Sequence, residues 1–137
     1  MQGSAIDINS AGEVVMQLGA QAFLYSGGVM TELGSLGGSS CPAGINDAGQ
    51  VVGYSGTSNG VQAFLYSNGT MRDLNSLIDP ACGWYLESAQ AINDNGQIVG
   101  YGTFAGQTEA FLLSPVPEPA TLSLLALGGL VALRRRR

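Results

Sequence analysis

Residues 45–53 read INDAGQVVG, and this stretch decides the fold because related copies stand on both sides of it. The copies read INSAGEVV at residues 8–15 and INDNGQIVG at residues 92–100. Their first residues, Ile8, Ile45 and Ile92, stand 37 and 47 positions apart. Self-similarity of this kind is the signature of a repeat architecture, so each copy is expected to open one structural unit.

A second motif follows each copy of the first. It reads QAFLY at residues 21–25, QAFLY at 62–66 and EAFLL at 109–113, and the first two copies continue into GVMTEL at 28–33 and GTMRDL at 69–74. Each unit therefore reads as four short strands. Gly12, Gly49 and Gly96 fit the hairpin position where φ must be positive, and Asn68-Gly69 predicts a second hairpin.

The strand expected over residues 61–66 carries apolar side chains on both faces. Val61, Ala63 and Leu65 point one way, and Phe64 and Tyr66 point the other way. A sheet that is apolar on both faces needs a neighbour on each side. The expected fold is therefore all-β, built of antiparallel four-stranded repeats in a β-propeller-like arrangement.

The array is expected to be incomplete or open. A closed propeller has about four to eight blades, and residues 1–115 supply two full units and a partial third. The third unit is expected to lack its fourth strand, because Ser114 and Pro115 directly follow Leu113. Three alternatives remain open at this point: a fragment of a longer array, association with copies of the same chain, or a curved open array.

The repeated residues resemble a known family. The elements INxxGQVVG, AFLY and MxDL are similar to the HAF repeat of bacterial extracellular proteins, over roughly residues 5–113. The name of that repeat comes from His-Ala-Phe, whereas Gln21, Gln62 and Glu109 stand at the His position here. The resemblance implies a surface location and a repeat architecture more than an activity.

Charge and composition exclude several classes of function. Residues 1–115 contain one Arg against nine acidic residues, so a body this acidic would repel nucleic acid. The chain has no His, which removes the commonest general base and metal ligand. Residues 56–60 match G-x-S-x-G, but they stand between two expected strands and read as a loop. We therefore expect no enzyme activity, no catalytic residue, no metal and no cofactor.

Two weaker features are candidate sites in the repeat region. Cys41 and Cys82 each follow a Leu-x-Ser-Leu segment after four residues, so they are a candidate disulfide between inter-repeat loops. Trp84 and Tyr85 lie in an insertion after Cys82 and form a candidate ligand loop that could stack on a sugar ring. The competing interpretation places Trp84 as a cap on the apolar end of a repeat.

Residues 116–137 form a separate tail. Pro117, Glu118 and Pro119 precede an apolar run over residues 120–133, and the chain ends on Arg134, Arg135, Arg136 and Arg137. We expect a short hydrophobic helix over the run. A helix of 14 residues would measure about 21 Å, short of the roughly 30 Å hydrocarbon core, and snorkelling Arg side chains would close part of that gap. The basic cluster would stay in the cytoplasm.

This order of parts closely resembles the PEP-CTERM sorting signal. The resemblance implies that an exosortase recognises Pro117, Glu118 and Pro119, cleaves nearby and releases the body from a transient span of the inner membrane. It also implies an exported surface or biofilm matrix protein, associated with exopolysaccharide or with itself. A carbohydrate- or protein-binding propeller is the alternative. No secretory signal peptide is visible before the first repeat, so we expect a truncated reading frame or a start assigned too late.

Overall fold

The computed structural model describes residues 3–115 and 122–125 of the 137-residue chain. These residues form three antiparallel four-stranded sheets in sequence order. The first sheet comprises β1 (Gly3–Ile8), β2 (Val14–Leu18), β3 (Gln21–Ser26) and β4 (Val29–Gly34). The second comprises β5 (Ser40–Ile45), β6 (Val51–Thr57), β7 (Gly60–Ser67) and β8 (Thr70–Asp73). The third comprises β9 (Trp84–Ile92), β10 (Ile98–Phe104), β11 (Gln107–Pro115) and β12 (Leu122–Leu125).

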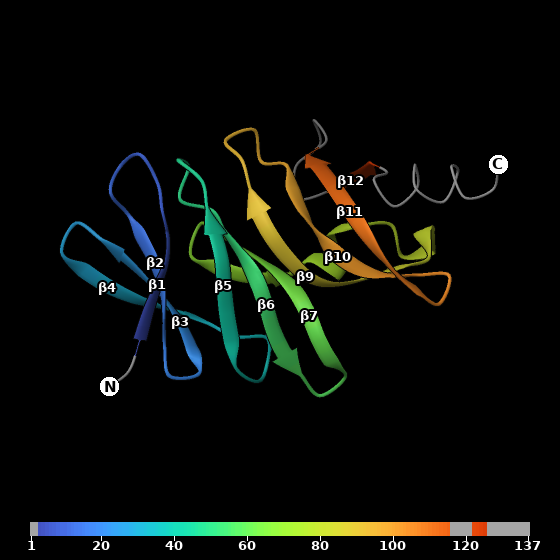
Figure 1. Ribbon diagram of the computed structural model, residues 1–137, viewed down its shortest axis with the longest axis horizontal. Coiled ribbons are helices and arrows are strands. Elements are labelled where there is room, and N and C mark those ends of the chain that lie inside the picture. Colours follow the sequence, from blue (N-terminus) through green and yellow to red (C-terminus); the bar gives the residue numbers. More distant parts are fainter. Residues whose placement is uncertain (1–2, 116–121, 126–137) are drawn as a thin grey trace.

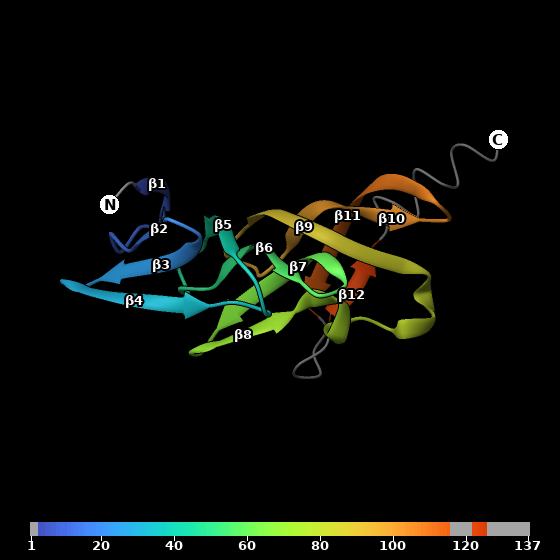
Figure 2. The same cartoon turned by 90° about the horizontal axis from the view of Figure 1, so that it is seen from below.

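The sheets follow one another along the long axis of the molecule, from the N-terminal to the C-terminal end (Figures 1 and 2). Two short 3₁₀ helices, η1 (Leu74–Leu77) and η2 (Pro80–Cys82), connect the second sheet to the third. The all-β, four-stranded repeat predicted from the sequence is therefore confirmed. The described residues form an open series of sheets, in agreement with the expected open array, whereas the propeller-like arrangement of the repeats is not confirmed.

The third sheet differs from its prediction. Strand β12 pairs with β11 through Leu112↔Leu125 to Pro115↔Leu122, so a fourth strand stands where the sequence predicted none. The hydrophobic helix predicted over residues 120–133 is not supported, because Leu122–Leu125 are extended and the rest of that run lies outside the described residues. A short apolar run suits either structure, and the unpaired edge of β11 offers a backbone partner that favours a strand.

The hydrophobic core is divided between the two gaps that separate the three sheets. In the first gap, Val15, Ala22 and Leu33 of the first sheet pack against Ile45, Val51 and Phe64 of the second. In the second gap, the opposite face of the second sheet packs on the third, through a cluster that includes Val52, Ala63, Leu74, Ile98, Phe111 and Leu113. The second sheet is therefore covered on both faces, as its two-sided apolar pattern requires.

The glycine of the Val-Val-Gly element has a packing role. A Cβ on Gly53 would lie 2.0 Å from the carbonyl oxygen of Cys41, and a Cβ on Gly100 would lie 2.0 Å from that of Ser88. Both glycines lie opposite a β-bulge in the preceding strand. Opposite Gly53 the register shifts between Pro42 and Gly44, and opposite Gly100 it shifts next to Ala89. The bulge brings the two backbones too close for any side chain.

Candidate functional site

Each sheet has a hairpin between its first and second strands, and the geometry of this hairpin repeats in all three sheets. Among the described residues, these three hairpins are the most organised polar feature. In the central hairpin, Asn46 is 3% exposed. Its Oδ1 accepts hydrogen bonds from the backbone N–H of Ala48 (3.1 Å) and Gln50 (2.9 Å), and its Nδ2 donates to Oε1 of Gln50 (2.8 Å). Gly49 adopts a φ of +80°, as Gly12 and Gly96 do in the other two turns, which confirms the predicted role of these glycines.

The same side chains also connect one sheet to the next. Nδ2 of Asn9 donates to the carbonyl oxygen of Asn46, and Nδ2 of Asn46 donates to the carbonyl oxygen of Asn93; the donor–acceptor distance is 3.0 Å in both bonds. A parallel series runs one residue further on. In this series, the backbone N–H of Ser10 donates to Oδ1 of Asp47, and the backbone N–H of Asp47 donates to Oδ1 of Asp94; both bonds measure 2.8 Å.

We call these connected turns, residues 8–13, 45–50 and 92–97, the turn ladder. The turn ladder runs along one edge of the molecule, across the loops that join β1 to β2, β5 to β6 and β9 to β10 (Figure 1). The sequence pattern predicts each turn as a hairpin, but the hydrogen bonds between turns are not predicted from it. The signal that could have revealed them is the repetition of Asn at positions 9, 46 and 93, since an Asn side chain has more hydrogen-bonding groups than one turn uses.

Two carboxylates of the turn ladder have shifted acidities. Hydrogen bonds from Asn9 and from Ser26 hold the pKa of Glu13 below its ordinary value of 4.5, and slight burial opposes them. The backbone N–H of Ser10, and then its hydroxyl, hold the pKa of Asp47 below its ordinary value of 3.8. Both groups are therefore charged at neutral pH and act as structural acceptors.

The cysteines predicted as a candidate disulfide are both free thiols. Cys41 lies in β5, where its Sγ accepts a hydrogen bond from Nε2 of Gln17 (3.2 Å), whereas Cys82 lies in η2 and packs against the core between the second and third sheets. They do not occupy equivalent positions. Cys41 pairs with Tyr54, and the residue that pairs with the equivalent Tyr101 is Ser88. The extra residues between Cys82 and Ile92 displace Cys82 from the register that the sequence indicated.

The candidate ligand residues Trp84 and Tyr85 begin strand β9. The half-buried Trp84 ring stacks on Phe104, with ring centroids 5.2 Å apart, and meets the edge of Phe111 at 6.3 Å. The hydroxyl of Tyr85 donates to the carbonyl oxygen of Val61 over 2.9 Å. Burial, followed by the charges of Asp73 and Glu87, raises the pKa of Tyr85. These contacts favour the interpretation of Trp84 as a cap on the core over the sugar-stacking alternative.

The described part of the chain holds no candidate metal site. Within residues 3–115 and 122–125, no three His, Cys, Asp or Glu side chains are grouped so that they could hold a metal ion. The G-x-S-x-G match at residues 56–60 is the hairpin between β6 and β7, where Thr57 pairs with Gly60. Over the same described residues, no helix has the length and apolar character needed to cross a membrane.

The tail of the chain matches the model of a known family. Residues 115–137 match the model of the PEP-CTERM protein-sorting motif. No curated protein and no solved structure gives a significant match, and the resemblance of residues 5–113 to the HAF repeat gains no support from these comparisons. Pro117, Glu118, Pro119 and the four terminal Arg residues lie within the matched segment and outside the described residues.

The match defines the class of protein to which the chain is similar. A PEP-CTERM motif indicates an exported protein with a C-terminal membrane-anchoring tail that an exosortase processes. Here the motif follows an acidic all-β body of three stacked sheets.

Proposed function

We propose that the chain is a non-enzymatic structural protein of the bacterial cell surface or extracellular matrix, delivered there by exosortase-dependent sorting. The observation that carries this proposal is the sorting motif at residues 115–137. The body attached to it supports a structural role, because its most organised polar groups are the Asn and Asp side chains of the turn ladder, which bond to neighbouring repeats.

The contacts of the turn ladder are of a kind that stabilises a repeat stack. Its Asn side chains are satisfied by backbone groups and by Gln or Glu side chains of the same and the next turn. Catalysis needs polar groups that are held apart from such partners and aimed at a substrate. The polar side chains of the turn ladder serve the stack, so we assign them to architecture.

The sorting step assigns roles to the tail. Pro117, Glu118 and Pro119 would form the recognition element for the exosortase, and the basic cluster Arg134–Arg137 would hold the end of the tail at the cytoplasmic side of the inner membrane. Cleavage near the recognition element would release the body to the surface. The body carries one Arg against nine acidic residues, so it would remain soluble and repel other anionic surfaces at low ionic strength.

Fractionation of cells tests the proposal. The full chain and a variant with Pro117, Glu118 and Pro119 all replaced by Ala are expressed in cells that have the exosortase. We expect the unaltered chain in the surface and matrix fractions and the variant in the membrane fraction. A control with Ser58→Ala and Asn59→Ala, in the exposed β6–β7 turn, is expected to behave as the unaltered chain. Equal distribution of all three chains would contradict the proposal.

A further inference from the structure

The two ends of the sheet series carry opposite halves of one repeated interface. Each internal gap joins a face of one sheet to the other face of the next sheet. The first kind of face carries Val15 and Ala22 in the first sheet, and Val52 and Ala63 in the second. We call it the forward face, because it always packs toward the sheet that follows in the sequence.

The second kind of face receives the forward face of the preceding sheet. It carries Ile45, Val51 and Phe64 in the second sheet, and Ile98 and Phe111, with Ile92 packed beside them, in the third. We call it the receiving face. In every unit these residues hold the same positions of the repeat, so the two internal interfaces share them. The second interface adds residues from the longer connection to the third sheet, such as Ile78, Leu86 and Trp84.

Within residues 3–115 and 122–125, no further sheet covers the forward face of the third sheet or the receiving face of the first sheet. Val99 is 36% exposed, whereas its equivalents Val15 and Val52 are both 0% exposed. Ile8 is 62% exposed, whereas its equivalent Ile45 is 5% exposed. The difference follows from position in the series, since the residue types are the same.

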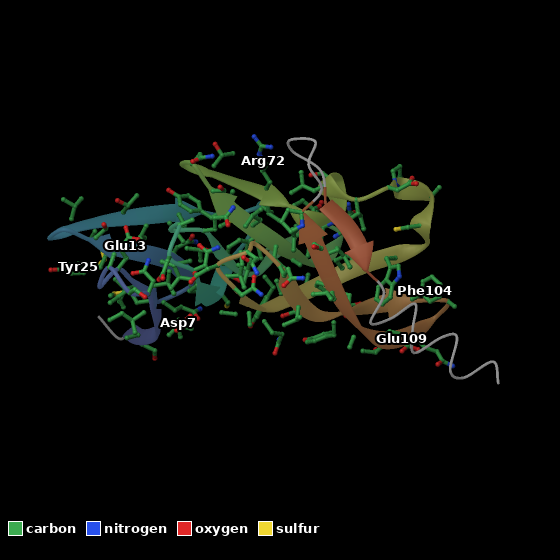
Figure 3. All side chains as sticks on the ribbon, turned by 90° about the horizontal axis from the view of Figure 1, so that it is seen from above. Asp7, Glu13, Tyr25, Arg72, Phe104 and Glu109 are labelled. Atoms are coloured by element: carbon green, nitrogen blue, oxygen red, sulfur yellow. The ribbon has the colours of Figure 1, made fainter. Side chains whose placement is uncertain are left out.

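Other residues of the two end faces agree with this assignment. On the third sheet, Ala110 is exposed, although the equivalent Ala22 and Ala63 are 0% exposed. On the first sheet, Tyr25 is 40% and Met30 is 46% exposed. Figure 3 places Tyr25 and Glu13 at one end of the molecule and Phe104 and Glu109 at the other. The two uncovered faces therefore lie too far apart to cover each other within one chain.

The turn ladder has matching open ends. Asn46 uses Nδ2 for both Gln50 and the next turn, whereas Nδ2 of Asn93 donates to Oε1 of Gln97 and reaches no further turn among the described residues. At the other end of the series, the carbonyl oxygen of Asn9 accepts one hydrogen bond among the described residues, from the backbone N–H of Gly12 in the same turn. A carbonyl oxygen has two lone pairs, so it can accept one more bond. The donor and the acceptor that would continue the series thus stand at opposite ends.

We propose that the protein associates head to tail, with the forward face of the third sheet of one copy packed on the receiving face of the first sheet of a second copy. The contact continues the internal interface. Val99 packs on Ile8 of the second copy in the same way that Val52 packs on the receiving face of the third sheet. Nδ2 of Asn93 donates to the carbonyl oxygen of Asn9 in that copy. Because the two patches differ, the interface is heterologous and the assembly grows without closing at a dimer.

Charge sets the conditions for this association. With one Arg against nine acidic residues in residues 1–115, two bodies repel each other over long range. Salt screens this repulsion but leaves the burial of apolar side chains intact. Association is therefore expected to strengthen as the salt concentration rises, which is the reverse of what an interface built on ion pairs would show.

Sedimentation velocity of the full chain tests the proposal, in a nonionic detergent with micelles in excess over protein so that tails do not share a micelle. The sedimentation coefficient of the unaltered chain is expected to rise with protein concentration past the value of a dimer. Ile8→Glu and Val99→Glu each bury an unpaired carboxylate in the contact and are expected to weaken association by at least about 100-fold. Val61→Glu is the matched control, because Val61 is also exposed (44%) but belongs to the second sheet and lies on neither end face.

Mixing the two variants gives the sharpest outcome. An Ile8→Glu chain keeps its forward face, and a Val99→Glu chain keeps its receiving face. An equimolar mixture is therefore expected to form dimers and nothing longer. Should circular dichroism show that either variant is unfolded, Met30→Glu and Ala110→Glu place the same charge on the same two faces.

Three results would overturn the proposal. The first is an unaltered chain that stays monomeric at every concentration, which would mean that something other than a second copy covers the end faces. The second is a single variant that associates as strongly as the unaltered chain, as attachment through the tails would allow. The third is a mixture that forms no dimer.

Discussion

Replacement of Asn46 by Ala tests whether the turn ladder stabilises the stack. The substitution removes four hydrogen bonds of 2.8–3.1 Å made by a side chain that is 3% exposed. A neutral hydrogen bond contributes roughly 1 kcal/mol net, and a buried group left without a partner costs more. Water can reach the N–H of exposed Ala48 and the carbonyl of exposed Asn93, which recovers part of the loss. We expect the free energy of unfolding to fall by about 3 kcal/mol.

Asn93→Ala is the matched control for that substitution. Asn93 organises its own turn in the same way, with bonds to Asn95 and Gln97, but it is exposed and its side chain reaches no further turn in the described part of the chain. Its replacement is expected to cost about 1 kcal/mol. Urea denaturation of the full chain measures both values, followed by the fluorescence of Trp84, the single Trp. A loss for Asn46→Ala no larger than for Asn93→Ala would refute the role assigned to the turn ladder.

Three further predictions concern the charge, the packing and the thiols. The lowered pKa of Glu13 stabilises the fold above the ordinary value of 4.5, and this contribution is lost as the pH falls below it through the folded-state pKa. In thermal melts, Glu13→Gln is therefore expected to be slightly less stable than the unaltered chain at pH 7 and to lose less stability on acidification. Gly53→Ala is expected to cost about 2 kcal/mol in urea denaturation, because its Cβ would meet the Cys41 backbone, whereas Gly56→Ala, with its nearest contact at 3.8 Å, is expected to change little. Alkylation of the protein unfolded in urea, without reductant, is expected to label both Cys41 and Cys82, and an intact mass with neither labelled would show them bridged.

The sequence predicted the repeat unit well because the unit is determined locally. The Ile-Asn-x-x-Gly turns, the Asn68-Gly69 hairpin and the two-sided apolar strands each follow from short-range rules, and the structure has all of them. Antiparallel pairing between neighbours in sequence then leaves few arrangements for each sheet.

Relations between the units were harder to predict. The inter-turn bonds of Asn9, Asn46 and Asn93 depend on how one sheet is placed against the next, which no single repeat encodes. Cys41 and Cys82 are not at equivalent positions for a related reason, because the sequence comparison counted residues from the preceding leucines. The structural register is instead set by pairing with Tyr54 and Tyr101.

The tail illustrates competition between two structures for one apolar segment. Hydrophobicity alone favoured a helix over residues 120–133, whereas Leu122–Leu125 extend as β12 along the free edge of β11. Composition describes how apolar a segment is but says nothing of the backbone partners that a neighbouring strand offers. For the sorting motif itself the order of its parts was sufficient, and residues 115–137 match that motif.

Intact mass spectrometry of the protein recovered from outside the cells tests most directly whether this is an exported body released from its sorting tail. The expected species ends near Pro117, lacks Arg134–Arg137, and is absent from the medium of cells without the exosortase. A species of full-length mass, found inside the cells and equally abundant with and without the exosortase, would contradict both the sorting and the surface role.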